Sequence, residues 1–514
     1  MRIDVLEMVV VKDVDVPLRK ARVFKLAAML FFAAFFVLRL TIVDGVAGAV
    51  HADENDIITR AAHVTPSPRQ LAWQEMEFTC FIHFGMAEDV DARQWVRVAR
   101  DAGMQMLVLT TKHHRGYCLW PTKTTDHSIQ QSSWKDGKGD VVADLAAACQ
   151  EYGLKMGVYI SPWDYHHPTY GTAAYDDVFK AQLRELLTGY GEVAEVWLDG
   201  YYGAQPATMQ DYDWQGYYDL IRELQPNAVI AICGPDVRWV GNEDGFARES
   251  EWSVVSARSF DFENVTNKTE RLLGFDRMEK DLGSRADIKD AEALIWHPSE
   301  VDVSIRPSWD YKPGEDLMVK SLDALLDIYY WSIGRNSVLL LNLTPSPQTG
   351  RIPDPDVKRL MELRAVLDAT FATNLAHGAK AVASHVRNDD DAYGAHNIVD
   401  GNPNTFWAPD EGVTTATLTF DLGGPKTFNR AMLQEYIREG QRIEKYQLEG
   451  WHEGAWRPIA RGTTVGYKWL LRFGTVTVDK VRLRITASRV CPTLKNFGLF
   501  LEPLPSVAAD NLQK

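Results

Sequence analysis

Between Phe78 and Asn342 the chain repeats one pattern: a short apolar run, a polar cluster, and an amphipathic stretch that ends at Gly or at Pro-Asn. This alternation predicts parallel strands that are joined by helices. The predicted strands are Phe78–His83, Met104–Thr110, Lys155–Ile160, Val193–Leu198, Ala228–Cys233, Ala293–Trp296 and Ser337–Leu341, with one more around Glu249–Val255. Strands and helices of this kind within about 270 residues predict a (β/α)8-like barrel, an α/β fold.

Apolar side chains at helical spacing predict the connecting helices. In Asp91–Ala102, for example, Trp95, Val98 and Ala99 share one face, and Gly103 follows as a helix stop signal. The same pattern recurs in Val142–Tyr152, Phe179–Tyr190, Trp214–Leu224 and Leu317–Ile333.

After Asn342 the alternation stops. Prolines between 345 and 355 predict an exit loop, and Asp356–Ala372 predicts one more helix. From about Asn374 short strands alternate with turns, which predicts an all-β sandwich. These strands are Ala416–Leu422, Phe428–Glu435, Ile443–Trp451, Trp456–Ala460 and Val476–Ile485. The predicted domains are a barrel at 53–350, a linker helix at 351–373, a sandwich at 374–505 and a tail at 506–514.

The N-terminal segment resembles a secretion signal. Four basic residues within positions 19–25 precede the apolar run 26–38, and small side chains near Ala52 suit signal peptidase. Arg39 and Asp44 interrupt the apolar part, which favours cleavage over a membrane span of about 20 apolar residues. We therefore expect 1–52 to be a signal peptide with an upstream extension, and the mature protein to be secreted or periplasmic without a membrane anchor.

Composition narrows the choice of partners. The net charge of −15 disfavours nucleic acid and anionic membranes, which require basic surfaces. The 16 Trp and 19 Tyr residues suit the binding of a neutral sugar. The 5 cysteines are odd in number and lack a CxxC pair, so they argue against a disulfide framework and a zinc site. We expect most of them to be small buried hydrophobic residues.

Polar side chains follow the first four predicted strands. His83 ends the first, His113 and His114 follow the second, Tyr159 lies near the end of the third, and Asp199 follows the fourth. The strand ends of a barrel meet on its active-site face, so these residues predict a catalytic carboxylate among groups that bind hydroxyls. Asp199-Gly200 is also a signal for a hairpin turn, which is the alternative interpretation. No HExxH spacing supports a metal site.

A retaining glycosidase needs a second carboxyl group about 5 Å from the nucleophile. If Asp199 is the nucleophile, Glu243 is a candidate, because it lies in the loop that follows the next predicted strand. The sequence leaves four neighbouring acids open as alternatives: Asp236, Asp244, Glu249 and Glu251.

Several motifs in this order resemble the α-L-fucosidases of glycoside hydrolase family 29. They are Phe81–Gly85, Lys112–Trp120, Gly157–Asp164, Trp197–Gly200, Arg238–Glu243 and Trp296–Arg306. The likeness extends from about Pro66 to Leu343 and continues into the C-terminal module. The opening Pro66–Trp73 resembles the branch that acts on α-1,3/1,4-linked fucose.

The resemblance implies a retaining exo-α-L-fucosidase that acts on fucosylated glycans without a catalytic cofactor. It implies Asp199 as nucleophile and Glu243 as acid/base. The implied substrate-binding residues are His83, His113, His114, Tyr159, Trp197, Trp239 and Trp309. Two alternatives stay open: a fucose-binding, lectin-like protein with weak or no turnover, and a retaining hydrolase for another sugar.

Two positions depart from this family pattern. Relatives of that branch have a longer loop with a Glu-Trp pair that contacts the sugar, whereas Gly85–Asp91 leads directly to the next helix. Relatives also have Asp after the His pair, where this chain has Arg115. These departures predict a more open pocket and weaker catalysis, unless Glu88 or Asp89 fills the gap or Arg115 points to solvent.

The segment Ile398–Trp407 resembles the discoidin-like, carbohydrate-binding sandwich found in coagulation factors. Relatives often hold a structural calcium ion in this loop through oxygen ligands. The matching positions are Asp400, Asn402, Thr405 and Glu502. A turn that packs without metal is the alternative.

Overall fold

The computed structural model describes residues 54–85, 88–200, 210–257 and 280–503. Residues Asp56–Lys514 form one compact unit. The predicted signal segment 1–52 and the tail 506–514 lie outside the described residues. Within the described ranges, no helix is both long and apolar enough to cross a membrane.

The predicted barrel is confirmed. Eight strands pair in parallel in the order β5-β4-β3-β2-β1-β10-β9-β6, and a parallel bridge between Ala231 and Val237 nearly closes the ring. The strands are β1 (Phe78–Ile82), β2 (Met106–Lys112), β3 (Lys155–Ile160), β4 (Glu195–Leu198), β5 (Val229–Ile232), β6 (Arg238–Trp239), β9 (Ser299–Ser304) and β10 (Val338–Leu343).

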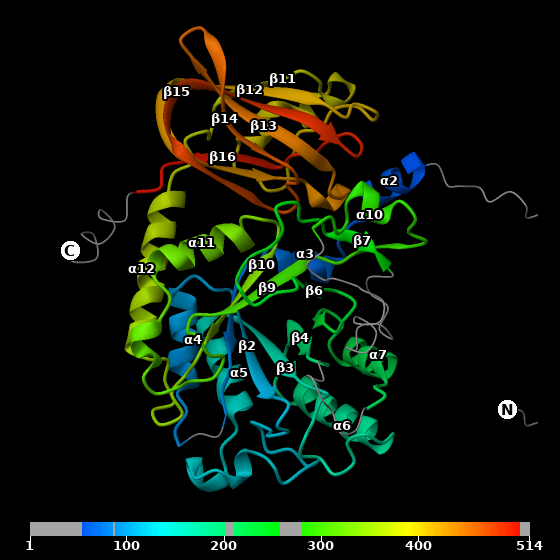
Figure 1. Cartoon of the computed structure of the whole chain (residues 1–514), viewed down its shortest axis with the longest axis vertical. Coiled ribbons are helices and arrows are strands. Elements are labelled where there is room, and N and C mark those ends of the chain that lie inside the picture. The colour runs from blue at the N-terminus through cyan, green and yellow to red at the C-terminus, as the bar shows by residue number, and fades with distance from the viewer. Residues whose placement is uncertain (1–53, 86–87, 201–209, 258–279, 504–514) are drawn as a thin grey trace, which may run out of the picture. The chain divides into compact units, whose positions relative to one another are not determined.

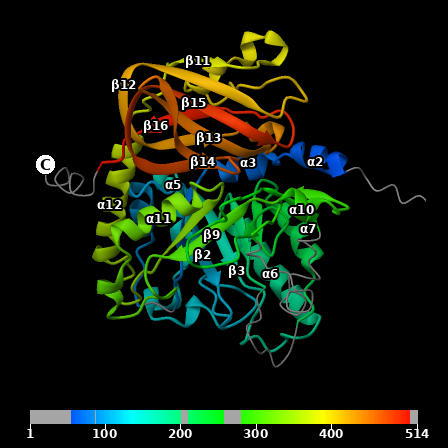
Figure 2. The same cartoon turned by 45° about the horizontal axis from the view of Figure 1, so that its top comes forward.

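Helices surround these strands in Figures 1 and 2. They include α4 (Ala92–Asp101), α5 (Val141–Tyr152), α6 (Ala174–Gly189), α7 (Trp214–Leu224), α11 (Leu322–Ser332) and α12 (Asp354–Phe371). Side-chain oxygens of Asp91, Asp140 and Asp213 accept main-chain N–H groups at the starts of α4, α5 and α7. Such caps satisfy donors that a helix leaves without internal partners, and they explain why these helices begin where they do.

Two of the predicted barrel strands are wrong. The segments Ala293–Trp296 and Glu249–Val255 supply β8 (Leu294–Trp296) and β7 (Val254–Ser256), which pair antiparallel outside the barrel. The barrel uses β9 and β6 in their place. Sequence patterning missed β9 because Glu300 and Asp302 interrupt its apolar positions, and it missed β6 because that strand has only two residues.

The C-terminal domain is an antiparallel β fold, in agreement with the predicted sandwich. Its strands are β11 (Lys380–Ala383), β12 (Ala416–Gln434), β13 (Ile443–His452), β14 (Ala455–Gly462), β15 (Trp469–Ser488) and β16 (Asn496–Phe500). Two predicted strands, Ala416–Leu422 and Phe428–Glu435, fall mostly within the long β12, whose register shifts between Asp421 and Lys426. Leu418, Phe420 and Phe497 are part of its core.

All five cysteines are buried, and none of them forms a disulfide, as predicted. Cys80 and Cys149 illustrate this role, because both pack in the main apolar core with β1 and α5. They add apolar contact and no cross-link.

Candidate active site

The carboxylate of Asp199 lies directly after β4, with its side chain 20% exposed. Its Oδ2 accepts a hydrogen bond from Tyr159 Oη at 2.8 Å and lies 3.3 Å from His114 Nε2. Three adjacent strands therefore bring together three predicted site residues. The hairpin alternative for Asp199-Gly200 is wrong, because β4 pairs in parallel with β3 on one side and with β5 on the other.

Gly200 is required by close packing. A Cβ atom at this position would lie 2.7 Å from the Trp214 ring, closer than real side chains approach. The glycine after Asp199 thus lets α7 pack against the end of β4.

Ser161 connects His114 to the main chain of Asp199. Its Oγ lies 2.8 Å from His114 Nδ1 and 2.9 Å from the Asp199 carbonyl oxygen, and it accepts the N–H of Trp163 at 3.1 Å. The sequence analysis did not single out Ser161. Its place in Tyr159-Ile-Ser-Pro, directly after β3, was the available signal.

His83 is oriented by Asn342 on the neighbouring strand β10. The Oδ1 atom of Asn342 lies 2.9 Å from His83 Nδ1 and accepts the main-chain N–H of His83 at 3.2 Å. Burial, followed by the nearby His113, lowers the pKa of His83 to about 3. The ring is therefore neutral, and Asn342 favours a proton on Nδ1.

His113 and His114 form a contiguous surface with Tyr159. The ring centroids of the two histidines are 4.2 Å apart, and His113 stacks on Tyr159 at 5.5 Å. The pKa of each histidine is lowered to about 4, chiefly by burial. The next contribution comes from His114 for His113, and from Lys112 for His114. Neutral imidazoles can both donate and accept, which suits the hydroxyl groups of a sugar.

The ligand atoms of His113, His114 and Asp199 lie within 4.8 Å of one another, a spacing that could also hold a metal ion. Tyr159 already donates to Asp199, and Ser161 already bonds to His114. These hydrogen bonds favour the interpretation as a hydroxyl-binding cluster.

Glu243 is exposed, and Trp309 contacts both Glu243 and His83. The Trp309 indole donates to Glu243 Oε2 at 2.9 Å, and its ring lies 5.1 Å from the ring of His83. Two alternatives to Glu243 are engaged in structural ion pairs. Asp236 pairs with two arginines, and Glu251 is buried between Arg238 and Arg248.

The indoles of Trp197 and Trp239 are turned toward buried acids. Trp197 donates to Glu300 Oε2 at 2.8 Å and stacks its ring on Tyr159, whereas Trp239 donates to Asp302 Oδ1 at 2.7 Å. Their N–H groups thus already donate hydrogen bonds within the protein. Only their ring faces and edges remain for a substrate.

Asp302 is a site residue that the sequence analysis missed. Its pKa is raised to about 7, chiefly by burial; the hydrogen bond from Trp239 acts against this shift, and the charges of Glu243 and Asp199 contribute to it. Asp302 therefore lies within electrostatic reach of both proposed catalytic acids. Alternation along Ser299–Ser304, which places Glu300 and Asp302 on one face of a strand, was the available signal.

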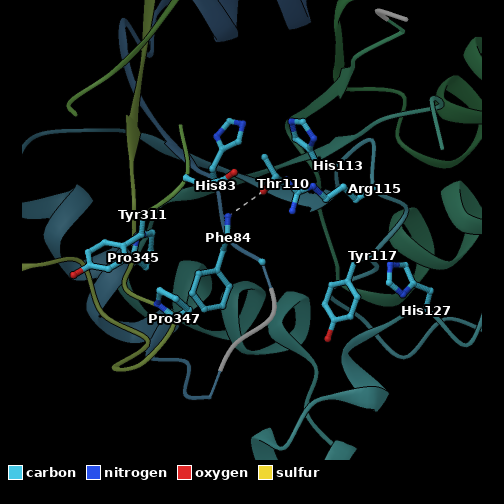
Figure 3. Close-up of a pocket in the computed structure, with 12 residues that line it drawn as sticks. His83, Phe84, Thr110, His113, Arg115, Tyr117, His127, Tyr311, Pro345 and Pro347 are labelled. Atoms are coloured by element: carbon cyan, nitrogen blue, oxygen red, sulfur yellow. Dashed lines mark hydrogen bonds between the residues drawn. The ribbon is translucent and has the colours of Figure 1, made fainter. Parts of the chain in front are cut away.

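A cavity of about 370 Å³ adjoins His83 and His113. Figure 3 shows Phe84, Tyr311 and two prolines on one side of it, and Arg115, Tyr117 and His127 on the other. Arg115 lines this cavity together with His113, and its side chain is exposed. Of the connection Gly85–Asp91, residues 86–87 are not described, and Glu88 N donates to Pro347 O at 2.9 Å.

The four positions that match calcium ligands do not form one cluster of contacts. Asp400 accepts from Asn402 N at 2.7 Å and from Thr405 Oγ1 at 2.8 Å, which closes a compact turn. Glu502 instead pairs with Arg430 and accepts the hydroxyl of Tyr330. Asp400, Asn402 and Thr405 lie in one loop, where both carboxylate oxygens of Asp400 accept hydrogen bonds from the other two residues.

A parallel barrel that presents carboxylates, neutral imidazoles and indoles at its strand ends is suited to a hydrolase for a hydroxyl-rich substrate. Comparison with known proteins gives the particular family. The family model described as Alpha-L-fucosidase matches residues 54–370, and the F5/8 type C domain matches 380–496. The chain belongs to the α-L-fucosidase family of glycoside hydrolases, with a C-terminal F5/8 type C domain.

Similar proteins cover most of the chain. Alpha-L-fucosidase 1 of Arabidopsis thaliana is 36% identical over 92% of this chain and 94% of its own length. A provisionally assigned α-L-fucosidase of Bacteroides ovatus has a crystal structure that is 41% identical, covers 88% of this chain and 77% of that one, and has a TM-score of 0.79. The Ruminococcus gnavus GH29 fucosidase in complex with fucose is 28% identical, covers 86% and 96%, and has a TM-score of 0.77.

Proposed function

We propose that this α-L-fucosidase is a retaining exo-enzyme in which Asp199 is the nucleophile and Glu243 the acid/base. The observation that carries the proposal is the position of Asp199: it follows a central barrel strand, is partly exposed, and is hydrogen-bonded by Tyr159 beside His114. An ionised carboxylate held in this way can attack an anomeric carbon. The neutral histidines next to it can bind the sugar hydroxyls.

The mechanism proceeds in two displacements. Asp199 forms a bond to the anomeric carbon while the glycosidic C–O bond breaks, and Glu243 gives its proton to the departing oxygen. Glu243 then takes a proton from water, whose oxygen attacks the same carbon and releases Asp199. Two inversions restore the original configuration.

Replacement of Asp199 tests this assignment. Asp199→Ala should lower kcat/KM on an aryl α-L-fucoside by at least about 1000-fold. Asp219→Asn on the exposed face of α7 is the matched control and should retain activity. Survival of Asp199→Ala activity within tenfold of wild type would refute the assignment.

The same assay separates the alternatives. A lectin-like protein would bind fucose without turnover, and a hydrolase for another sugar would act on a neighbouring glycoside. The wild-type product, followed by proton NMR, should first appear as the α-anomer. Initial appearance of the β-anomer would show inversion.

For the natural substrate we propose terminal α-1,3/1,4-linked fucose on glycans. The support is the sequence resemblance of Pro66–Trp73 to that branch of the family. Hydrolysis of α-1,3- and α-1,4-fucosylated oligosaccharides should exceed that of α-1,2- and α-1,6-linked ones at equal concentration. A preference for the last two linkages would contradict the proposal.

We also propose export, because the segment 1–52 has the basic and apolar regions of a signal peptide. Expression of the full chain in a secreting host should yield an exported protein that begins near residue 53. An intact N-terminus on the exported or retained protein would contradict cleavage.

Calcium binding in the C-terminal domain is a separate proposal that involves Asp400, Asn402 and Thr405. Their oxygens are of the type that calcium prefers. Isothermal titration with calcium should show binding that Asp400→Ala removes. No heat of binding to wild-type protein would favour the turn without metal.

A further inference from the structure

The hydroxyl of Ser161 stands between two acceptors that belong to the same functional unit. Its oxygen lies 2.8 Å from Nδ1 of His114 and 2.9 Å from the carbonyl oxygen of Asp199. The other nitrogen of His114 lies 3.3 Å from the carboxylate of Asp199. Ser161, His114 and Asp199 therefore form a closed ring of polar contacts that begins and ends on the proposed nucleophile.

The number of protons limits this ring to two arrangements. Ser161 is a single O–H donor, and the N–H of Trp163 already occupies one of its lone pairs. Burial and then the charge of Lys112 lower the pKa of His114 to about 4, so the imidazole of His114 carries one N–H near neutral pH. The position of that proton depends on where the Ser161 proton points.

In the first arrangement Ser161 donates to the Asp199 carbonyl group. His114 Nδ1–H then donates to Ser161, and the bare Nε2 faces the Asp199 carboxylate. Two lone pairs would oppose each other at 3.3 Å, which is unfavourable while Asp199 is ionised.

In the second arrangement Ser161 donates to His114 Nδ1. Nε2 then carries the proton and donates to Oδ2 of Asp199, which also accepts from Tyr159 at 2.8 Å. The ionised carboxylate gains a further donor and a fixed orientation, while the neutral carbonyl oxygen of Asp199 loses the Ser161 proton at 2.9 Å. The exchange is favourable because a charged acceptor gains more from a donor than a neutral acceptor loses. Hydrogen bonds to an ionised group are stronger than those between neutral groups.

We infer that Ser161 is a positioning residue that selects the Nε2–H tautomer of His114 and thereby orients the nucleophile Asp199. The inference rests on the proposed role of Asp199 and deepens it. Ser161 is fully buried after β3 and contacts the main-chain carbonyl of Asp199, whereas it reaches the reacting carboxylate through His114. The same orientation is needed in both displacements, because Asp199 attacks in the first and leaves in the second.

A double-mutant cycle separates this role from simple packing. Ser161→Ala should lower kcat on an aryl fucoside by about 10- to 100-fold, with KM within about threefold. His114→Gln replaces Nε2–H with an amide N–H that needs no partner to set its tautomer. In the His114→Gln background, Ser161→Ala should therefore cost less than about threefold.

Ser332→Ala is the matched control, because Ser332 is also fully buried and its hydroxyl donates to Ile328 O at 2.6 Å within α11. It should leave kcat unchanged within about twofold. Equal losses from Ser161→Ala in the wild-type and His114→Gln backgrounds would overturn the inference. An unchanged kcat for Ser161→Ala in the wild-type background would also overturn the inference.

A second measurement does not depend on whether Ser161→Ala folds. The ¹⁵N chemical shifts of labelled histidine in the wild-type protein, assigned by the signal missing from His114→Gln, distinguish the two tautomers. We expect Nε2 to be protonated and Nδ1 bare near neutral pH, and the reverse would overturn the inference. If wild-type protein hydrolyses no fucoside, or Asp199→Ala stays active, the proposed function fails instead.

Discussion

Tyr159 donates its phenolic hydrogen to Oδ2 of Asp199 at 2.8 Å, from one barrel strand to the end of the next. Burial and then the charge of Asp199 raise the pKa of Tyr159 far above its ordinary value, so the phenol remains a donor across the working pH range. Its ring also stacks on His113 and Trp197. One side chain thus orients the carboxylate and forms part of the wall beside it.

Removal of this hydroxyl tests how much the orientation contributes. Tyr159→Phe keeps the stacked ring and removes only the donor, so kcat on an aryl fucoside should fall by about 10- to 100-fold. The melting temperature should change by only a few degrees. Tyr165→Phe, an exposed tyrosine near His114, is the control. Unchanged kcat in Tyr159→Phe would show that the hydrogen bond does not assist the reaction.

Glu243 should matter most when the departing group needs a proton. Glu243→Gln cannot donate one, so we expect kcat/KM to fall by about 100-fold or more on oligosaccharides and by less than about tenfold on an activated aryl fucoside. Glu223→Gln, which changes an exposed acid on α7, is the control. Equal losses on both substrates in Glu243→Gln would move the role to Asp244 or Glu249, the two alternatives that are not held in buried ion pairs.

The buried Asp302 should make stability depend on pH. Its ordinary pKa of 3.8 is raised to about 7 in the folded protein, chiefly by burial. Between about pH 4 and pH 7 the unfolded chain releases this proton while the folded chain retains it, so the free energy of unfolding falls as the pH rises. Asp302→Asn removes the titration.

Urea unfolding of wild-type protein and Asp302→Asn at several pH values measures this effect. The stability of the variant relative to wild type should increase by at most about 4 kcal/mol from pH 4 to pH 7, and then level off. Asp219→Asn should show no such trend. A constant difference across this range would mean that Asp302 is ionised in the folded protein.

Arg115 should limit catalysis through the histidine pair. The pKa of His113 is lowered to about 4 mainly by burial and by His114, with a further contribution from the Arg115 charge. His113 is already neutral near pH 7, so Arg115 does not act through its protonation. Arg115→Asp places beside His113 the carboxylate that the family pattern has after the His pair, an acceptor for its N–H, and should raise kcat/KM on an aryl fucoside by up to about tenfold. Arg97→Asp on α4 controls for the change in net charge. No gain would show that this departure from the family pattern does not limit the enzyme.

The C-terminal domain should assist binding or stability and leave the chemistry unchanged. Trp456 pairs with Trp451 at 5.2 Å between β14 and β13 and is partly exposed, so it offers an aromatic surface for sugar. Trp456→Ala should leave kcat/KM on a small aryl fucoside within about twofold. Loss of turnover in a variant with an unchanged melting temperature would contradict this division of roles.

The order of strands and helices could be predicted from the sequence because the spacing of apolar residues and the helix stop signals are local properties. The runs before His83 and Asp199 are mostly apolar, and Gly153 ends α5 with φ of 76°. Such runs become strands wherever both faces are buried. Polar side chains at their ends then had to gather on one face, since parallel strands share direction. The positions of Asp199, Tyr159 and His114 follow from that rule.

Other features depended on contacts between distant segments. Ser299–Ser304 reads as polar, yet it is a central strand because Trp197 and Trp239 supply donors to Glu300 and Asp302 inside the barrel. The ion pair between Asp236 and Arg69 joins distant parts of the chain, and no local pattern contains it. Glu251 pairs with Arg238 and with the nearby Arg248, and only the fold shows that these pairs are buried.

The sequence by itself determined the alternating barrel, the β-rich C-terminal domain and the acid at the end of the fourth strand, because each depends on residues near in the chain. Tertiary structure alone decided which acids stay available, which nitrogen of His114 faces Asp199, and where Ser161 places its proton. Those outcomes depend on distances of about 3 Å between groups from different strands, and hydrogen bonds change sharply with small displacements. Local sequence patterns carry no such distances.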